Sequence, residues 1–132
     1  MTTVHTDRIF YAGADRLDIT RKSGNPTFAP SWRILRPMID ARRHGPSWVW
    51  LWPQYVKDYT AEMRISYREN RAVWDALLAR DEVTLVCYCI DPKHCHRTVL
   101  AEILGKLGAT VRWERGASQT DLEAIVEAAR QV

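Results

Sequence analysis

The most constraining stretch of this 132-residue chain is an almost wholly apolar run, VTLVCY, at residues 83–88. Its length is that of an ordinary strand, and its lack of polar alternation is typical of a strand that is buried on both faces. Strands of this kind lie inside parallel sheets that helices cover. The run therefore predicts an α/β fold with residues 83–88 near the centre of a parallel sheet.

The segments after this run predict a helix, a second strand and a last helix. The first helix spans residues 95–107 and ends at Gly108, because glycine commonly terminates helices. Residues 110–113 form the strand, and Ser118 is the N-cap of the last, amphipathic helix. A strand, a helix and a strand in this order predict a parallel pair of strands joined by a crossover.

The N-terminal part predicts a different arrangement of strands. Residues 8–12 and 16–20 are short runs that favour strands, and only the segment Gly13-Ala14-Asp15 separates them. Three residues are too few for a parallel crossover. This part of the chain therefore predicts a hairpin or a remodelled edge of the sheet.

Two helical regions lie between these strands and the apolar run. Ser31 is the N-cap of a helix toward Arg43, in which Pro37 is expected to start a second turn. A longer helical pattern starts at Pro53, and Asn70 divides it in two. The segments together predict one α/β domain over residues 1–132. Its architecture is expected to be three-layer and Rossmann-like, with a mostly parallel sheet and an antiparallel or remodelled N-terminal edge.

Composition narrows the class of protein. Hydrophobic residues make up 46% and charged residues 27% of the chain, a balance that excludes a disordered protein. No apolar run approaches the roughly 20 residues of a membrane helix, and the N-terminus does not resemble a secretion signal. The three cysteines are clustered and odd in number, unlike a secreted disulfide framework. We therefore expect a soluble, cytoplasmic protein with reduced thiols and no membrane partner.

Candidate site residues gather where the apolar strand ends and the next helix begins. Ligands of open α/β sheets collect at the carboxyl ends of the strands, and a helix start offers free N–H groups and a positive dipole end. Arg97 and Thr98 add a charge and a hydroxyl in the first turn. These features predict an anion site for phosphate or carboxylate, in which Arg97 is a site charge rather than a core residue. Cys95 beside Arg97 is expected to favour the thiolate.

The cysteines of this stretch have three interpretations. In the first, Cys87 or Cys95 is a nucleophile and His96 transfers protons, with no cofactor. In the second, Cys87, Cys89, Cys95 and His96 bind zinc, although their spacing differs from that of paired zinc knuckles. In the third, the cysteines are small core residues and His96 packs or caps. The sequence is compatible with an enzyme and with a protein that binds without turnover.

The same stretch, CYCIDPKHCHRTVLAEIL, resembles the DUF488 family, a domain family without a settled activity. Its members have a cysteine at the strand end and a Cys-His-Arg tripeptide at the start of the next helix, matched here by Cys87 and by residues 95–97. An earlier family motif is a strand end with Asp and Arg, followed by a loop and a Phe, and residues 17–28 are similar to it. With a Tyr-rich helical stretch between the motifs, the resemblance covers most of residues 8–115.

The chain departs from the family pattern at two places. Cys89 stands where the family has an acidic residue, which favours a contact of its thiol with a ligand or a metal. The family also usually has a helix between its first two strands, whereas this chain has only residues 13–15 there.

The resemblance adds Asp18, Arg21 and Asn25 as candidate site residues. A strand at residues 17–20 that lies beside the apolar strand would direct its following loop toward the same crevice. Asp18 would then orient His96 or a ligand hydroxyl, Arg21 would face the ligand opposite Arg97, and Asn25 would bind the ligand. The alternative is a structural ion pair between Asp18 and Arg21.

Three indoles at period two, those of Trp48, Trp50 and Trp52, precede Pro53. In an extended segment they would share one face. They are interpreted as core packing, as a dimer interface or as a wall on which nucleobases stack. We favour a homodimer with Trp50 near the centre of its interface.

These observations predict a site for a small phosphorylated ligand, most simply a nucleotide or nucleobase derivative. A module that sequesters a nucleotide or docks a partner without catalysis is one alternative. A small zinc-binding accessory protein for nucleic-acid processing is another. The net charge of +3 is too small to indicate a polyanion partner by itself, although basic residues concentrate in residues 8–43.

Overall fold

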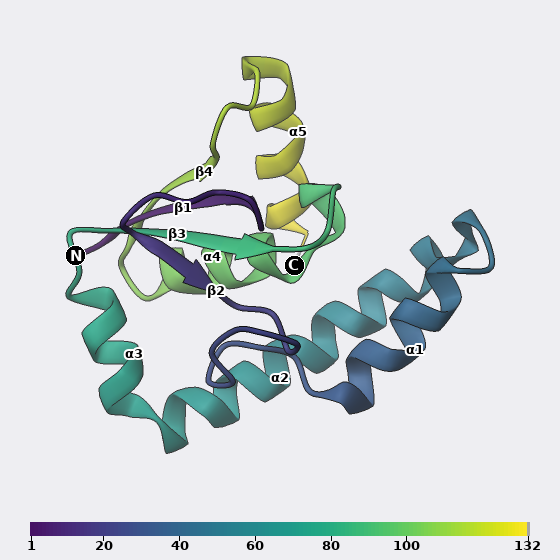
Figure 1. Cartoon of the computed structure of the whole chain (residues 1–132), viewed down its shortest axis with the longest axis horizontal. Helices are drawn as coiled ribbons and strands as arrows, with labels where there is room; N and C mark the ends of the chain where they lie inside the picture. The colour runs from purple at the N-terminus through teal and green to yellow at the C-terminus, as the bar shows by residue number, and fades with distance from the viewer. Residues whose placement is uncertain (132) are drawn as a thin grey trace.

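The computed structural model describes residues 1–131, and its centre is a sheet of four parallel strands (Figure 1). The strands are β1 (Thr3–Arg8), β2 (Arg16–Asp18), β3 (Glu82–Cys87) and β4 (Thr110–Glu114), and their order in the sheet is β2-β3-β1-β4. Every residue of β3 except Glu82 is buried. The predicted central strand and the α/β class are therefore confirmed, and the arrangement is consistent with a three-layer fold.

Of the two arrangements predicted for the N-terminal strands, an antiparallel hairpin or a remodelled edge, the structure rules out the hairpin. β1 begins at Thr3, in a mostly polar segment that was not predicted to be a strand. Residues 9–15 connect β1 to β2. β1 and β2 lie on opposite sides of β3 and both run parallel to it, with Arg8 opposite Cys87 and Leu17 opposite Leu85. The longer connection crosses β3 instead of turning back beside β1. β2 is a three-residue strand at the edge of the sheet.

The second half also differs in its strand pairing. α4 (His96–Lys106) follows β3 and ends before Gly108, whose φ of 109° is the left-handed conformation that glycine tolerates. β4 runs parallel to β3, but it pairs with β1, which lies between them. The predicted parallel orientation of these two strands, joined through a helix, is confirmed, and β1 separates them in the sheet. α5 (Gln119–Arg130) follows, and the Ser118 side chain caps it as predicted by accepting a hydrogen bond from the Asp121 N–H.

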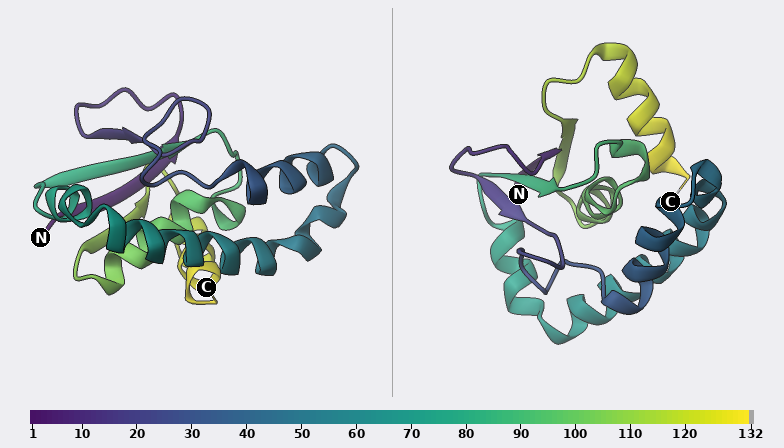
Figure 2. Two further views of the ribbon diagram at one scale, coloured as in Figure 1. Left: turned by 90° about the horizontal axis from the view of Figure 1, so that it is seen from below. Right: turned by 45° about the vertical axis from the view of Figure 1, so that its right-hand side comes forward.

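The remaining helices are α1 (Trp32–Arg42), the 3₁₀ helix η1 (Pro46–Leu51), α2 (Trp52–Glu69) and α3 (Arg71–Leu78). α1 continues through Pro37 without the expected second start, whereas Asn70 separates α2 from α3 as predicted. α1, η1 and the first half of α2 project beyond the sheet (Figures 1 and 2). We call this projection the helical arm. Within residues 1–131, no helix combines the length and apolarity needed to cross a membrane.

The core lies between the sheet and the helices. α4 contacts β1, β3 and β4, and α2 contacts both α3 and α4. Trp74, Tyr59 and Phe28 are the largest apolar side chains that are fully buried there. Phe28 packs edge-on against Trp74, and its carbonyl accepts a hydrogen bond from the Tyr59 hydroxyl. The loop after β2 is thus fixed to α2 and α3, beside the carboxyl end of β3.

Candidate functional site

Three thiols meet at the carboxyl end of β3. Cys87 is the last residue of that strand, Cys89 follows two residues later, and Cys95 is the residue before the first turn of α4. Their sulfur atoms all lie within 4.8 Å of one another, and the Sγ atoms of Cys87 and Cys89 are 3.8 Å apart. The structure therefore brings together the three cysteines of the sequence prediction.

His96 is fixed by a backbone group instead of by the predicted carboxylate of Asp18. Its Nε2 lies 2.9 Å from the carbonyl oxygen of Ile19, and its Nδ1 lies 3.7 Å from Cys87 Sγ. Since a carbonyl oxygen only accepts hydrogen bonds, Nε2 is the protonated nitrogen. In the neutral ring, Nδ1 then carries a lone pair on the side of Cys87 Sγ, whose single S–H can donate either to it or to Cys89.

Arg97 is a fully buried residue, contrary to the prediction of a site charge outside the core. Its guanidinium forms a two-point ion pair with Glu114 on β4, at 2.8 and 3.1 Å. Its Nη1 donates to the carbonyl of Cys89 at 2.7 Å and to Cys95 Sγ at 3.3 Å. Burial lowers the pKa of Arg97, but the charges and hydrogen bonds of Cys95 and Glu114 raise it above its ordinary value. The cation therefore fixes the cysteine loop against α4 and β4.

Thr98 is also engaged inside the protein. Its hydroxyl donates to the carbonyl oxygen of Pro92, and its side chain is buried. The first turn of α4 thus uses the side chains of both Arg97 and Thr98 to hold the loop at residues 89–95.

The second set of predicted residues shapes the loop after β2. Asp18 accepts hydrogen bonds from the Thr20 N–H and the Ser23 hydroxyl, and Asn25 accepts one from the Thr27 N–H. Arg21 donates to the carbonyl of Pro30 at 3.0 Å. Within residues 1–131, no ion pair joins Asp18 to Arg21. β2 does lie beside β3, as predicted.

A pocket of about 300 Å³ opens over the thiols. The three cysteines and His96 line it together with aromatic side chains and cations. The aromatic residues are Trp32, Trp52, Tyr55 and Tyr88, and the cations are Arg21, Lys22 and Arg42. Lys22 is exposed, and it forms no ion pair within the part of the chain that the structure describes. Trp32, Arg42, Trp52 and Tyr55 come from α1 and α2, so one side of the pocket belongs to the helical arm.

Arg42 is one site residue that the sequence did not reveal. It comes from the end of α1, and its guanidinium donates to Cys89 Sγ at 3.4 Å and to the carbonyl of His94 at 2.8 Å. The same group lies 4.3 Å from the centre of the Trp48 ring. No local pattern marks Arg42, because its partners are far along the chain.

The protonation of two thiols follows from their surroundings. The hydrogen bond from Cys87 to Cys89, with burial, raises the pKa of Cys87 to about 12. The hydrogen bond from Cys87 lowers the pKa of Cys89, but a hydrogen bond with Cys95 and burial raise it to about 11. Both groups are therefore neutral thiols near pH 7. This disfavours Cys87 as the predicted nucleophile.

The model of a family described as the active DUF488-N3 subclade matches residues 2–108. The chain belongs to the DUF488 family. No curated protein and no solved structure matches the chain. The DUF488 match runs from β1 through α4, and it includes the thiols, the loop after β2 and the helical arm. β4 and α5 lie beyond it, so the Glu114 partner of Arg97 is outside the matched region.

The sulfur geometry of this DUF488 protein also fits a metal ion. Sulfur atoms that share a tetrahedral zinc ion lie about 3.8 Å apart, given Zn–S bonds of about 2.3 Å. The Cys87–Cys89 separation has this value, and all three thiols lie within 4.8 Å. His96 is not part of this set. Three thiolates with a fourth position open toward the pocket are the arrangement that fits.

Proposed function

We propose that this DUF488 protein binds a small, planar, anionic molecule in the cysteine pocket and that Cys95 adds to one of its ring double bonds as a nucleophile. The S–C bond forms as the ring π bond breaks, and the proton of the thiol ends on the neighbouring ring atom, so that no leaving group departs. The observation that carries the proposal is the position of Cys95 Sγ. It lines the pocket at the start of α4 and accepts a hydrogen bond from the Arg97 guanidinium at 3.3 Å. A cation and a helix start stabilise negative charge on sulfur, the form in which cysteine is nucleophilic.

Neighbouring groups support a division of roles. Cys87 and Cys89 hold their protons because their pKa values are raised, so they do not compete with Cys95. His96 is immobilised by Ile19 and faces Cys87, which makes it the candidate proton carrier. The buried ion pair of Arg97 keeps the positive charge beside Cys95 in place.

The pocket walls support a nucleotide or a nucleobase derivative as the ligand. Trp52 stacks on Tyr55 with ring centres 5.3 Å apart, which gives a flat aromatic surface inside the pocket. Aromatic faces bind planar rings by stacking. Lys22 lines the same pocket without an ion-pair partner among the described residues, and it would take the negative charge of a phosphate.

Alkylation tests the nucleophile. We expect iodoacetamide to modify Cys95 first at pH 7, about tenfold or more faster than Cys87 or Cys89. Peptide mass spectrometry after short exposures locates the label, and a rate profile over pH gives the titration of each thiol. The variants Cys87→Ser and Cys89→Ser serve as controls that keep Cys95. Equal labelling of all three thiols, or an inert Cys95, would contradict the proposal.

Calorimetric titration with mononucleotides and free nucleobases tests the ligand. Lys22→Glu should weaken nucleotide binding about tenfold while leaving nucleobase binding unchanged, since only the phosphate meets Lys22. Arg112→Glu, an exposed change of equal charge on β4, is the matched control. Absence of binding by every nucleotide and nucleobase would remove this ligand class.

A zinc site is the second candidate function, favoured by the approach of the three sulfur atoms. Zinc would bind Cys87, Cys89 and Cys95 and would act as a Lewis acid at the open position. Native mass spectrometry of protein purified without added metal distinguishes the candidates. One zinc ion per chain that is lost in Cys89→Ser would support the metal site, whereas metal-free protein with a reactive Cys95 would support the nucleophile.

A further inference from the structure

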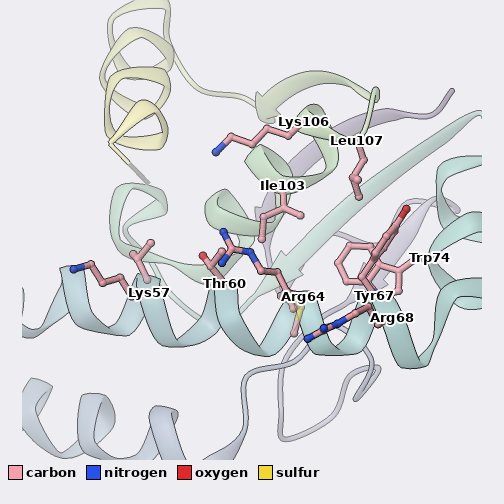
Figure 3. Close-up of a pocket in the computed structure, with 11 residues that line it drawn as sticks. Lys57, Thr60, Arg64, Tyr67, Arg68, Trp74, Ile103, Lys106 and Leu107 are labelled. Atoms are coloured by element: carbon pink, nitrogen blue, oxygen red, sulfur yellow. The ribbon is translucent and has the colours of Figure 1, made fainter.

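A second hollow lies between α2 and α4, apart from the cysteine pocket (Figure 3). It has a volume of about 730 Å³, and its lining shares no residue with that of the cysteine pocket. Its apolar floor consists of Val56, Met63, Trp74, Ile103 and Leu107. We call it the α2–α4 groove.

Cations surround this apolar floor. Lys57, Arg64 and Arg68 come from α2, and Lys106 comes from α4 on the opposite side (Figure 3). All four side chains are exposed, and none forms an ion pair within residues 1–131. The lining contains no Asp or Glu. Four uncompensated positive charges around an apolar groove call for a ligand that is both apolar and acidic.

The spacing of the groups on α2 matches the repeat of a helix. Lys57, Thr60, Arg64 and Arg68 are three or four residues apart, so they form one stripe along the groove. The Thr60 hydroxyl oxygen is buried and has no hydrogen-bond partner in the described chain, and Figure 3 shows Thr60 beside Arg64 on this side of α2. A polar group of the partner would satisfy it.

The floor favours a protein helix over a nucleic acid. Trp74 is fully buried, and the face of Tyr67 lies 4.5 Å from the Arg71 guanidinium. Trp74 therefore offers no face to a stacking base, and one face of Tyr67 is already taken by the Arg71 guanidinium. Aliphatic side chains such as Ile103 and Leu107 instead suit the apolar residues of an amphipathic helix.

We propose that the α2–α4 groove is a docking site for an acidic amphipathic helix of another protein. The apolar side chains of that helix lie on the floor, and its carboxylates pair with Lys57, Arg64, Arg68 and Lys106. The groove thereby connects the DUF488 domain to a partner while the cysteine pocket stays open.

A synthetic 18-residue helical peptide with Leu at positions 1, 4, 5, 8, 11, 12 and 15 and Glu elsewhere is the probe. Fluorescence anisotropy in low salt should show saturable binding to the full chain. The double variant Arg64→Glu and Arg68→Glu should weaken it at least about tenfold, because four favourable charge contacts become two. The pair Arg36→Glu, on α1, and Arg43→Glu, immediately after α1, makes the same charge change away from the groove and should leave affinity within about twofold. Circular dichroism checks that both double variants are folded.

Three results would overturn the proposal. Equal loss in the two double variants would mean that only the overall charge attracts the peptide. Undiminished binding of a peptide in which Ser replaces every Leu would mean that the apolar floor plays no part. Tighter binding of a single-stranded oligonucleotide, lost in Arg64→Glu and Arg68→Glu, would assign the groove to nucleic acid. None of these outcomes depends on the reactivity of Cys95.

Discussion

Arg97 illustrates how one buried charge can organise a site without lining its pocket. It joins β4 through Glu114, the cysteine loop through the Cys89 carbonyl and the start of α4 through Cys95. A buried cation is stable only when its donors are matched in this way. The position of the three thiols therefore depends on a contact with a strand that follows them in the sequence.

Replacing Arg97 should destabilise the whole protein. We expect Arg97→Met to lower the free energy of unfolding by about 3–5 kcal/mol, because Glu114 loses its buried partner. Arg97→Met combined with Glu114→Gln should recover part of this loss. Urea unfolding followed by tryptophan fluorescence measures both. A single variant within about 1 kcal/mol of wild type would mean that the ion pair does not hold the loop.

Asp15 should make the protein sensitive to acid. Burial raises the pKa of this carboxyl. Hydrogen bonds from Thr84 and Tyr11 and the charge of Arg115 outweigh burial and lower the pKa below the ordinary value of 3.8. A carboxyl whose pKa is lower in the folded than in the unfolded protein stabilises the fold at pH values above its unfolded-state pKa. This stabilisation is lost as the pH falls through the folded-state pKa. Asp15→Asn should therefore cost about 1 kcal/mol at pH 7 and progressively less below about pH 4. Urea titrations from pH 3 to pH 7 test this, and a pH-independent difference would contradict it.

The role of an individual residue was predictable from the sequence only where its partners are close to it along the chain. The thiols of Cys87, Cys89 and Cys95 were found because a strand end and the next helix start meet at the same edge of a parallel sheet. The burial of Arg97 was not predicted, because its partner Glu114 comes from another strand and no local sequence pattern indicates an ion pair. Arg42 was missed for the same reason, since α1 reaches Cys89 only in the folded chain.

At the scale of elements, apolar patterns identified β3 and α4, and capping residues identified the start of α5. β1 was not predicted as a strand because its sequence, TVHTDR, is mostly polar, although Val4 and Thr6 are buried. The more apolar residues 8–12 lie almost entirely outside β1, and Phe10 is 82% exposed. Central strands that pair on both sides gain their stability from neighbours that local sequence does not specify.

The cap of α5 gives a prediction at this scale. Ser118→Ala should lower the free energy of unfolding by about 1 kcal/mol, because the Asp121 N–H loses its acceptor at the helix start. Ser118→Asp should retain most of the stability, since aspartate caps helices equally well. Thermal unfolding of the three proteins compares them. Equal stability of Ser118→Ala and wild type would show that water replaces the cap.

For the whole molecule, the helical arm supports the proposal of a homodimer. The indoles do not share one face, because η1 is a 3₁₀ helix instead of an extended segment. Trp48 packs on Arg42 and His94, and Trp52 packs on Tyr55. Trp50 is 86% exposed, with Val49 and Leu51 partly exposed beside it. Such a patch is typical of an interface between proteins.

Sedimentation velocity tests this proposal. The wild type should sediment as a dimer at micromolar concentration. Trp50→Ser should raise the dissociation constant of that dimer at least about tenfold. Phe10→Ser, which removes another exposed ring on the connection between β1 and β2, is the control. A monomeric wild type at high concentration would reject the interface, and a dimer that survives Trp50→Ser would place it elsewhere.

The central position of β1 has a consequence for how the chain is made on the ribosome. Thr3 pairs with Glu82 on one side and with Thr110 on the other, so the first strand to leave the exit tunnel has no partner until most of the chain has followed. The segment that forms α1, α2 and α3 emerges in the interval and can adopt local helical structure at once. A nascent chain arrested just before β3 should therefore expose β1 to protease, and protection should arise only after β4 is synthesised. Release of the last strand, and not of the first, would start the cooperative folding of this sheet.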